Sequence, residues 1–372
     1  MRHSRGRSVT HITVQPSLGT MTRKIPYRRR MRGVAEKGTF LLTKAENIMY
    51  LAGTDAASML IVPRDGDPVI IAPRLESDRA REESWIRDVR CFQEGEVPLR
   101  RGERCVRESG LSVAKDVLRD LQVEEVFFDA LDHRAYSFLR SFHPRASDLV
   151  ERRRMIKEAE EIRLLERARE VAGDAYLEVS SEMDEEVTEL QLAGKVYQAV
   201  MSRGARCAFE PIVAFDENTA FPHHVPTKRQ LGSSSVVMMD LGARVQGYCS
   251  DITRTTLLFP GPAEESLEAV RTSIAEVVDR LEQGMPLSKV DSMVRDALGR
   301  EAAHFLHGLG HGLGLAVHEL PAVTPNSKER LRNGMVFTIE PGLYYRGRYG
   351  VRWEEDVVFS KGRARIMGGA VI

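Results

Sequence analysis

The chain of 372 residues is long enough for two domains, because a single hydrophobic core usually stops growing at about 250–300 residues. Its composition, 42% hydrophobic and 29% charged residues, is typical of a globular protein with ample core material. No apolar run approaches the roughly 18 residues that a membrane-spanning helix needs, which excludes an integral membrane protein and predicts no membrane partner.

The formal net charge of zero conceals a basic N-terminus. Residues 1–32 contain nine of the 54 Arg and Lys residues and no acid, so the rest of the chain has 45 bases against 54 acids. We predict that residues 1–32 form a disordered extension, or that the true start is Met21 or Met31. A nucleic-acid contact and an Arg- and Ser-rich organellar address are the less favoured interpretations.

The cysteines lie far apart in the sequence and form no C-x-x-C pair. This spacing is typical neither of a zinc knuckle nor of a disulfide framework. It predicts reduced thiols and a cytoplasmic protein. The four residues are Cys91, Cys105, Cys207 and Cys249.

Strand-like and helical segments alternate in the first part of the chain. The apolar runs 58–63 and 68–73 lie on either side of a turn and predict a β-hairpin. Together with the other segments they predict a smaller α/β domain over residues 33–148. The other segments are strands at 39–42 and 123–129 and helices near 77–84, 112–121 and 133–142.

A long charged helix starting near Leu149 is predicted to open the second domain, residues 149–372. Further helices are expected at 184–203, 265–282 and 288–306, the last with Ser288 and Asp291 in capping-box spacing. Close-set strands joined by short glycine turns give this half an antiparallel α+β character. These strands are expected at 207–215, 234–242, 248–259, 335–342 and 350–359.

The segment 307–321, HGLGHGLGLAVHELP, holds three of the ten histidines among four glycines. Each glycine would cost about 1 kcal/mol inside a helix, so the helical zinc motif that also spaces two histidines four apart is excluded. The segment is predicted to be a loop or an irregular strand. Three histidines in one such segment call for acidic partners elsewhere in the chain.

Acidic residues stand at strand ends in the second domain. Asp240 and Asp251 lie eleven residues apart with glycines between them, so a hairpin would bring both to neighbouring strands. Glu340 closes the apolar run MVFTI. In the last motif, GVRWEED, strand periodicity places Arg352 and Glu354 on one face and Trp353 and Glu355 on the other.

For each of these acids alone, a structural role is the favoured explanation, such as a salt bridge between Arg352 and Glu354 or an acid at a strand end. Together with one histidine they make a five-ligand set rich in oxygen, which suits a pair of divalent ions that share carboxylates. A single structural zinc would not need so many carboxylates. The five residues are Asp240, Asp251, His311, Glu340 and Glu354.

Five motifs, in this order, resemble those of the pita-bread metallopeptidases, in particular the prolidase and aminopeptidase P branch, the Xaa-Pro peptidases. The resemblance covers about residues 33–372. It implies an α+β fold in which a pita-bread catalytic domain follows a smaller α/β domain, and it offers no counterpart for the basic tail. The motifs are IVAFDENTAFPHHVP, DLGARVQGYCSDITRT, HGLGHGLGLAVHELP, IEPGLYY and GVRWEED.

The resemblance implies a site with two divalent metal ions, which could be manganese, cobalt or zinc. Asp240 would hold one ion and His311 and Glu340 the other, with Asp251 and Glu354 bridging both. Position 355 is Glu where the family more often has Asp, so the neighbouring glutamate could be mistaken for the ligand. The strand-face argument independently favours Glu354.

The resemblance also implies roles for residues around the metal ions. His223 and His318 match catalytic histidines that face the substrate, and Glu340 matches the residue that handles the proton of the attacking water. His307 matches a pocket histidine, and Arg352 matches an arginine that steadies the last acidic motif; both are expected to help bind substrate. For His224, a core or surface role stays as open as a catalytic one.

The implied function is a binuclear exopeptidase that hydrolyses the Xaa-Pro bond of dipeptides or short peptides through a hydroxide held between the ions. A proline-containing peptide and a second copy of the chain, in a homodimer, are the expected partners. A methionine aminopeptidase shares the five ligands and is the second enzyme interpretation. A non-catalytic binding module, or a related non-peptidase of the creatinase kind, is less favoured because such proteins are expected to lack these ligands.

Overall fold

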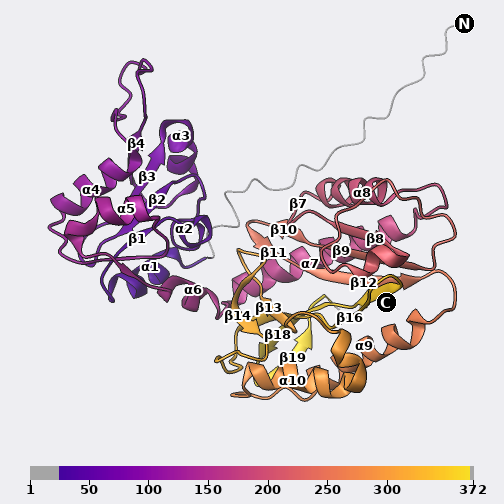
Figure 1. Ribbon diagram of the computed structural model, residues 1–372. Helices are drawn as coiled ribbons and strands as arrows, with labels where there is room; N and C mark the ends of the chain where they lie inside the picture. The colour runs from indigo at the N-terminus through magenta and orange to yellow at the C-terminus, as the bar shows by residue number, and fades with distance from the viewer. Residues whose placement is uncertain (1–24, 369–372) are drawn as a thin grey trace, which may run out of the picture.

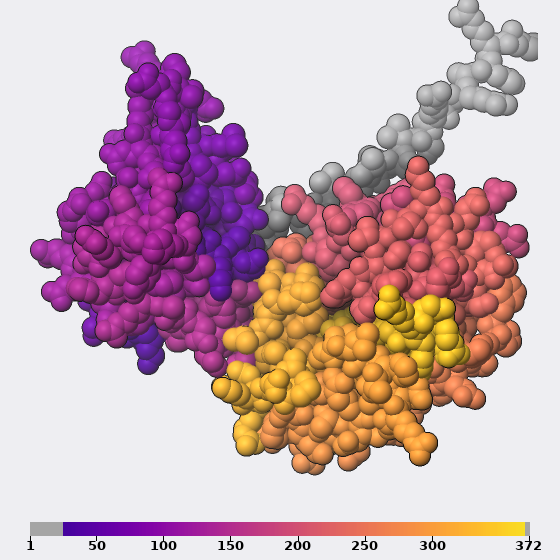
Figure 2. All heavy atoms as spheres, in the orientation of Figure 1, coloured from indigo at the N-terminus to yellow at the C-terminus, as the bar shows by residue number. Residues whose placement is uncertain are grey.

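The computed structural model describes residues 25–368, which form two domains on either side of a short connecting segment (Figure 1). The space-filling view in Figure 2 shows them as two lobes that meet along one side. In the part of the chain that is described, no helix is long and apolar enough to cross a membrane.

The predicted basic extension, residues 1–32, lies mostly outside the described residues. Its last part is helical, because helix α1 (Tyr27–Ala35) begins there. The buried guanidinium group of Arg30 in this helix forms ion pairs with Glu158 and Glu161. The prediction of disorder is therefore wrong for the part that α1 covers, since burial and ion pairing outweigh its basic composition.

The N-terminal domain is built on one six-stranded mixed sheet, in the order β4-β3-β2-β1-β5-β6. β2 and β3 pair antiparallel as the predicted hairpin, whereas β4 and β5 run parallel to their inner neighbours, which confirms an α/β domain. Its strands are β1 (Thr39–Leu42), β2 (Met59–Val62), β3 (Val69–Pro73), β4 (Asp88–Phe92), β5 (Val126–Phe128) and β6 (Arg145–Ala146). Its further helices are α2 (Ala45–Ala52), α3 (Arg74–Glu83), α4 (Gly110–Asp120), α5 (His133–Phe138) and the short η3 (Arg140–Phe142).

Cys91 and Cys105 form a disulfide bond in this domain, with their Cα atoms 4.6 Å apart. The chain leaves β4 and returns so that Val106 pairs beside the end of this strand, which brings the two cysteines together. The prediction of reduced thiols is wrong for this pair, because such a return is a tertiary feature that no short cysteine motif signals. Cys207 and Cys249 are free, and burial raises their pKa values to about 11 and about 12.

The long helix predicted from Leu149 is two helices, α6 (Leu149–Arg154) and α7 (Ala159–Ser180). Glu158 ends the continuity, because it caps α7 in a capping box with the third residue of that helix. The backbone N–H of Lys157 leaves the helical pattern and donates to the carbonyl oxygen of Gly334, 2.7 Å away. Capping and this tertiary hydrogen bond therefore break a segment that its charge pattern alone predicts as continuous.

The C-terminal domain consists of antiparallel sheets with helices packed on them, which confirms the predicted α+β class. Its two larger sheets have the orders β12-β9-β8 and β14-β13-β15-β18-β19. The strands of these sheets are β8 (Ile212–Phe215), β9 (Val236–Leu241), β12 (Ile252–Leu257), β13 (Gly310–Gly312), β14 (Glu319–Val323), β15 (Met335–Ile339), β18 (Glu355–Ser360) and β19 (Arg363–Ile366). The smaller sheets contain β7 (Arg206–Cys207), β10 (Ala243–Val245), β11 (Tyr248–Cys249), β16 (Gly342–Tyr345) and β17 (Tyr349–Arg352).

The remaining helices differ in their starts from the sequence prediction. Helix α8 begins at Glu189 rather than near residue 184, because Thr188 caps it in a capping box with Gln191. These helices are α8 (Glu189–Ser202), η4 (Asp216–Ala220), α9 (Ala263–Val278), α10 (Leu287–Leu298) and η5 (Gly299–His304).

The predicted capping box of α10 is also wrong. Pro286 occupies the N-cap position instead of Ser288. The buried carboxylate of Asp291 accepts hydrogen bonds from Arg295 and, at 3.0 Å, from the backbone N–H of Leu309. Asp291 thus holds the start of the glycine-rich segment on α10 rather than capping its own helix.

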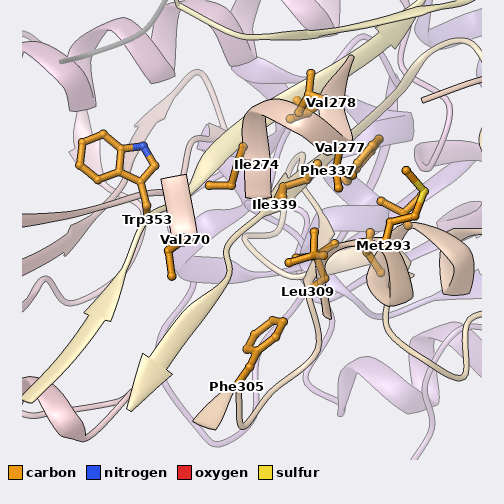
Figure 3. Packing of buried hydrophobic residues seen from close by; sticks show 14 of the residues in the cluster. Val270, Ile274, Val277, Val278, Met293, Phe305, Leu309, Phe337, Ile339 and Trp353 are labelled. Carbon is orange, nitrogen blue, oxygen red and sulfur yellow. The ribbon is translucent and has the colours of Figure 1, made fainter. Parts of the chain in front are cut away.

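The main core of the C-terminal domain lies between α9, α10 and the sheet of β15 (Figure 3). Val270 and Ile274 of α9 belong to the same buried cluster as Phe337 and Ile339 of β15, and Leu309 joins them from the glycine-rich segment (Figure 3). These side chains are buried, so the strands that carry the candidate ligands rest on a packed layer. A second core runs through the contact between the domains and includes Leu313 and Leu315 beside residues of the N-terminal sheet.

Candidate metal centre

Asp240 and Asp251 meet on neighbouring strands, as the hairpin argument predicted. Asp240 near the end of β9 lies opposite Thr253 of β12 in the antiparallel register. Asp251 precedes Thr253 by two residues and therefore lies on the same face. The intervening chain forms β10 and β11, so the connection is longer than a simple turn but brings the same carboxylates together.

His311 lies in the short strand β13, and the carboxylate of Glu340 follows β15 beside it. The Nε2 atom of His311 is 3.3 Å from Oε1 of Glu340 and 3.7 Å from Oδ2 of Asp251. Thr338 links these two ligand candidates, because its hydroxyl accepts the backbone N–H of His311 and donates to Glu340. Two strands far apart in sequence are thereby held at a constant spacing.

Glycine allows β13 to fit between its neighbours. A Cβ atom at Gly310 would lie 2.1 Å from the carbonyl oxygen of Thr338, and one at Gly312 would lie 2.1 Å from that of Leu320. Any side chain at these positions would push the strands apart. Of the two predicted alternatives, a loop or an irregular strand, the segment is an irregular strand at this point.

Glu354 and Glu355 lie in different environments. Oε2 of Glu354 accepts a hydrogen bond from the hydroxyl of Thr253 at 2.8 Å, beside the other candidate ligands. Glu355 instead accepts hydrogen bonds from Arg169 and Arg254, at 2.9 and 2.7 Å, in the protein core. The alternation expected for an extended strand therefore separates a candidate ligand from a structural ion pair.

Arg352 forms its ion pair with Asp240. The alternative for this strand, a salt bridge between Arg352 and Glu354, is not formed. Its Nη2 donates to Oδ2 of Asp240 at 2.6 Å, and its Nε donates to the hydroxyl of Thr253 at 3.0 Å. Its Nη1 donates to the hydroxyl of Tyr344, 2.9 Å away. Arg352 therefore orients one candidate ligand, and its expected part in substrate binding stays a prediction.

Tyr344 is a site residue that the sequence analysis missed. Its hydroxyl accepts from Arg352 and is 2.9 Å from Nε2 of His307, so it joins these two predicted residues. Burial raises the pKa of Tyr344 to about 12, so the phenol is protonated at neutral pH. The available signal was its position in IEPGLYY, four residues after Glu340 and hence on the same side of an extended chain.

Three histidines that the sequence predicts around the metal ions, His223, His307 and His318, lie near the candidate ligands. The rings of His311 and His318 are 4.2 Å apart in an edge-to-face arrangement. Burial lowers the pKa of His307 and of His318, and the nearby charge of His223 lowers both pKa values further. These effects favour neutral imidazoles at His307 and His318, while His223 and His318 remain exposed.

The carboxylates of the site repel one another. Burial, followed by the charges of neighbouring carboxylates, raises the pKa values of Asp251 and Glu354 well above their ordinary range. Burial also raises the pKa of Asp240, although the charge of Arg352 opposes this effect. For Glu340 the effect of burial is outweighed by the hydrogen bond and charge of His311, so its pKa is lowered.

The donor atoms fit divalent metal ions. Three buried carboxylate oxygens, one each on Asp240, Asp251 and Glu354, accept no hydrogen bond from the residues that the structure describes. Ligand atoms of these residues lie within 4.8 Å of one another, as do those of His311, Glu340 and Glu354. Converging carboxylates with unused oxygens and one imidazole are the donors that hard and borderline divalent ions prefer. A third trio, Asp251, His311 and His318, has equally close donor atoms.

Arg352→Lys is expected to weaken metal binding and kcat/KM by about 10- to 100-fold, as loss of a residue that orients a ligand typically does. One ammonium group cannot replace a planar guanidinium that serves Asp240, Thr253 and Tyr344 together. Metal titration and steady-state kinetics measure the two losses. Arg300→Lys is the matched control, since Arg300 lies exposed in η5 away from the candidate ligands. Wild-type metal affinity in Arg352→Lys would contradict the assigned role.

Comparison with known proteins agrees with this geometry. Residues 163–361 match metallopeptidase family M24, and residues 33–156 match the Creatinase/Prolidase N-terminal domain. A curated relative, the Xaa-Pro dipeptidase of Pyrococcus furiosus, is 32% identical over 333 residues, which cover 87% of this chain and 91% of the relative.

Solved structures of similar proteins extend over nearly the whole chain. The prolidase of Pyrococcus horikoshii OT3 aligns with a TM-score of 0.80 and 27% identity, covering 92% of this chain and 98% of its own. The X-Pro aminopeptidase of Thermotoga maritima MSB8 aligns with a TM-score of 0.77 and 25% identity, covering 91% and 98%. The fold is thus the pita-bread fold behind a Creatinase/Prolidase N-terminal domain, and the divalent-metal site implied by the sequence belongs to it. The chain belongs to metallopeptidase family M24.

Proposed function

We propose that this metallopeptidase hydrolyses the Xaa-Pro bond of dipeptides, with two divalent ions in its site. The observation that carries the proposal is the cluster of buried carboxylates with unused oxygens beside His311. Two relatives of the chain, an Xaa-Pro dipeptidase and a prolidase, supply the substrate class. A methionine aminopeptidase is less well supported, because the chain carries the additional N-terminal domain.

The residues present fit a binuclear site. Asp240 would hold one ion, His311 and Glu340 the other, and Asp251 and Glu354 would bridge them. When bound, divalent ions would supply Lewis acidity, which lowers the pKa of a water and polarises the carbonyl of the scissile bond. Manganese, cobalt and zinc all suit these donors.

The residues of the chain move the proton and stabilise charge. Glu340, held by Thr338 and His311, would accept the proton of the attacking water and pass it to the leaving proline nitrogen. His223 and His318 are exposed beside the cluster and would donate hydrogen bonds to the carbonyl oxygen as negative charge develops there. His307, fixed through Tyr344, would line the pocket for the substrate.

An Xaa-Pro dipeptide is expected to be hydrolysed with a kcat/KM at least about tenfold above that for the same pair extended at its C-terminus, a difference of 1.4 kcal/mol. A dipeptidase distinguishes the two through the free carboxylate of proline, which a cationic group can pair. The measurement compares kcat/KM for the two peptides and for a matched peptide without proline. If the protein hydrolyses none of the three peptides, the proposal is wrong.

The second candidate is an X-Pro aminopeptidase that acts on longer peptides. One observation favours it: Arg352, a candidate partner for the proline carboxylate, is already bound to Asp240 and Tyr344. Arg348, another candidate partner for the proline carboxylate, lies over the rings of Tyr345 and Tyr349. A preference for the extended peptide in the same assay would select this function.

His311→Ala is expected to lose metal, whereas His318→Ala is expected to keep it and to lose about 100- to 1000-fold in kcat, the usual effect of removing one charge-stabilising donor. The prediction separates a ligand from a donor although both rings lie close to Asp251. Elemental analysis gives metal per chain, and steady-state kinetics give kcat. Equal metal loss in both variants would mean that His318 is a ligand.

Further expectations from the sequence stay proposals. We propose that the protein forms a homodimer, which sedimentation tests. We also propose that it is located in the cytoplasm, which cell fractionation tests. The Cys91–Cys105 disulfide removes the argument for this location from reduced thiols. We also propose a division into an N-terminal domain at 33–148 and a catalytic domain at 149–372. Limited proteolysis tests that boundary.

A further inference from the structure

Glu189 is a fully buried carboxylate at the start of α8, outside the metal cluster. Its Oε1 accepts hydrogen bonds from the backbone N–H of Phe215 at 2.9 Å and from the side chain of Asn218 at 2.8 Å. Its Oε2 is 2.9 Å from Nε2 of His224, and accepts from the backbone N–H and the hydroxyl of Thr227 at 2.9 and 2.6 Å. One carboxylate therefore gathers donors from four residues of the segment 215–227.

The same segment carries His223, whose side chain is exposed and lies near enough to His318 to affect its charge. Backbone contacts reinforce the attachment to α8: the N–H groups of Glu189 and Leu190 donate to the carbonyl oxygens of Arg229 and Thr227. The segment 215–229 is thus fastened to α8 both before and after His223.

The opposite side of the segment is held by the strand that carries the arginine of the metal cluster. Nη1 of Arg352 donates to the carbonyl oxygen of Pro222, 3.1 Å away, directly before His223. The backbone N–H of Gly350 donates to the hydroxyl of Thr219 at 2.6 Å. His223 therefore lies between a point tied to the metal site and a point, His224, tied to α8.

We propose that Glu189 and His224 are positioning residues, which clamp the segment 215–227 so that His223 is presented to the substrate carbonyl. The proposal rests on the proposed function, in which His223 donates a hydrogen bond during hydrolysis. It assigns His224 a role through its neighbour rather than on the substrate. A carboxylate suits this task because both of its oxygens accept hydrogen bonds. An amide has only one oxygen, and its NH2 group would face donors with which it cannot form hydrogen bonds.

The energetic logic favours a fixed donor. A side chain that must be ordered in each turnover costs part of the stabilisation that it gives, whereas one already held in place does not. Loss of the clamp should therefore lower kcat more than it raises KM, because the contact of His223 strengthens in the transition state. Metal content should not change, since the clamp contains no candidate ligand.

A double-mutant cycle tests the proposal in the full-length, metal-loaded protein. His224→Ala is expected to lower kcat/KM for an Xaa-Pro dipeptide about tenfold, and less than about twofold when His223 is already alanine, because residues that act through one another are not additive. His224→Gln should recover most of the loss, since its amide N–H can donate to Glu189. His133→Ala, an exposed change in the N-terminal domain, is the control.

Hydrogen exchange of peptides covering residues 215–230 gives a second readout that does not depend on activity. Exchange should be faster in His224→Ala, and near the wild-type rate in His224→Gln. Glu189→Gln should show the same faster exchange if it folds. If wild-type protein fails to cleave any Xaa-Pro peptide, the proposed function is lost while exchange still tests the clamp. Equal fold-losses in both backgrounds, or unchanged exchange, would overturn the inference.

Discussion

Asp251→Ala is expected to lose its bound metal and at least about a thousandfold in kcat/KM, because transition-state stabilisation by metal is worth several kcal/mol and each 1.4 kcal/mol is tenfold. Asp251 belongs to two of the three groups of converging donors and has a buried oxygen with no hydrogen bond from the described residues. Elemental analysis and kinetics on the purified variant measure both losses.

Chelation of the wild-type protein should have the same effect and should be reversed by a divalent ion. Asp279→Ala is the matched control for Asp251→Ala, because Asp279 lies exposed at the end of α9. Full turnover by protein shown by elemental analysis to be free of metal would contradict the proposed mechanism. Retention of metal by Asp251→Ala would contradict the ligand assignment alone.

Glu354→Gln and Glu355→Gln are expected to change the stability of the metal-free protein in opposite directions. Glu354 lies buried among like charges, so a neutral amide removes repulsion and raises the melting temperature. Glu355→Gln removes the carboxylate that two fully buried arginines, Arg169 and Arg254, share, which typically costs about 3–5 kcal/mol. Thermal unfolding of both chelated variants beside the wild type measures the difference.

The stability of the metal-free protein should also depend on pH, in a direction that the pKa of Glu354 determines. Burial and neighbouring carboxylates raise the folded-state pKa of Glu354 above its ordinary value of 4.5. Its contribution to stability is therefore present below about pH 4.5 and is lost as the pH rises through the raised pKa. Metal-free wild type should lose stability over this range, and Glu354→Gln should lose less of it.

Added metal should then reverse the order. Ions that bind the folded state raise the melting temperature of the wild type by mass action, and Glu354→Gln should gain little because a bridging ligand is missing. A melting temperature that rises equally in both proteins would show that Glu354 is not a ligand. If Glu355→Gln instead lost the metal response, the ligand would lie one residue further along the strand.

Local sequence was enough to predict the strands on which most of the candidate ligands stand. The spacing of Asp240 and Asp251 around glycines predicted neighbouring strands, and the structure has them there. Glycine content predicted that His311 stands on an irregular strand, where Gly310 and Gly312 approach other backbones closely. The spacing of the two aspartates and the glycine content are local features, which backbone geometry and side-chain alternation control directly. The close approach of Gly310 to Thr338 is a tertiary contact.

The ends of helices were less well predicted. The sequence predicts one helix over residues 149–179, yet a capping box at Glu158 and the hydrogen bond from Lys157 to Gly334 divide it. Asp291 sits in capping-box spacing but accepts the backbone N–H of Leu309 instead. In both places a contact from a distant part of the chain competes successfully with a local pattern of similar energy.

Only the tertiary structure decided which groups become partners. Arg352 pairs with Asp240 across 112 residues, rather than with the glutamate two positions away. Tyr344 joins His307 to that arginine, and Glu189 reaches His224 from another helix. Spacing along a chain determines the face on which a side chain lies, but the identity of its partner depends on how separate elements pack, because that packing is decided by burial summed over the whole core.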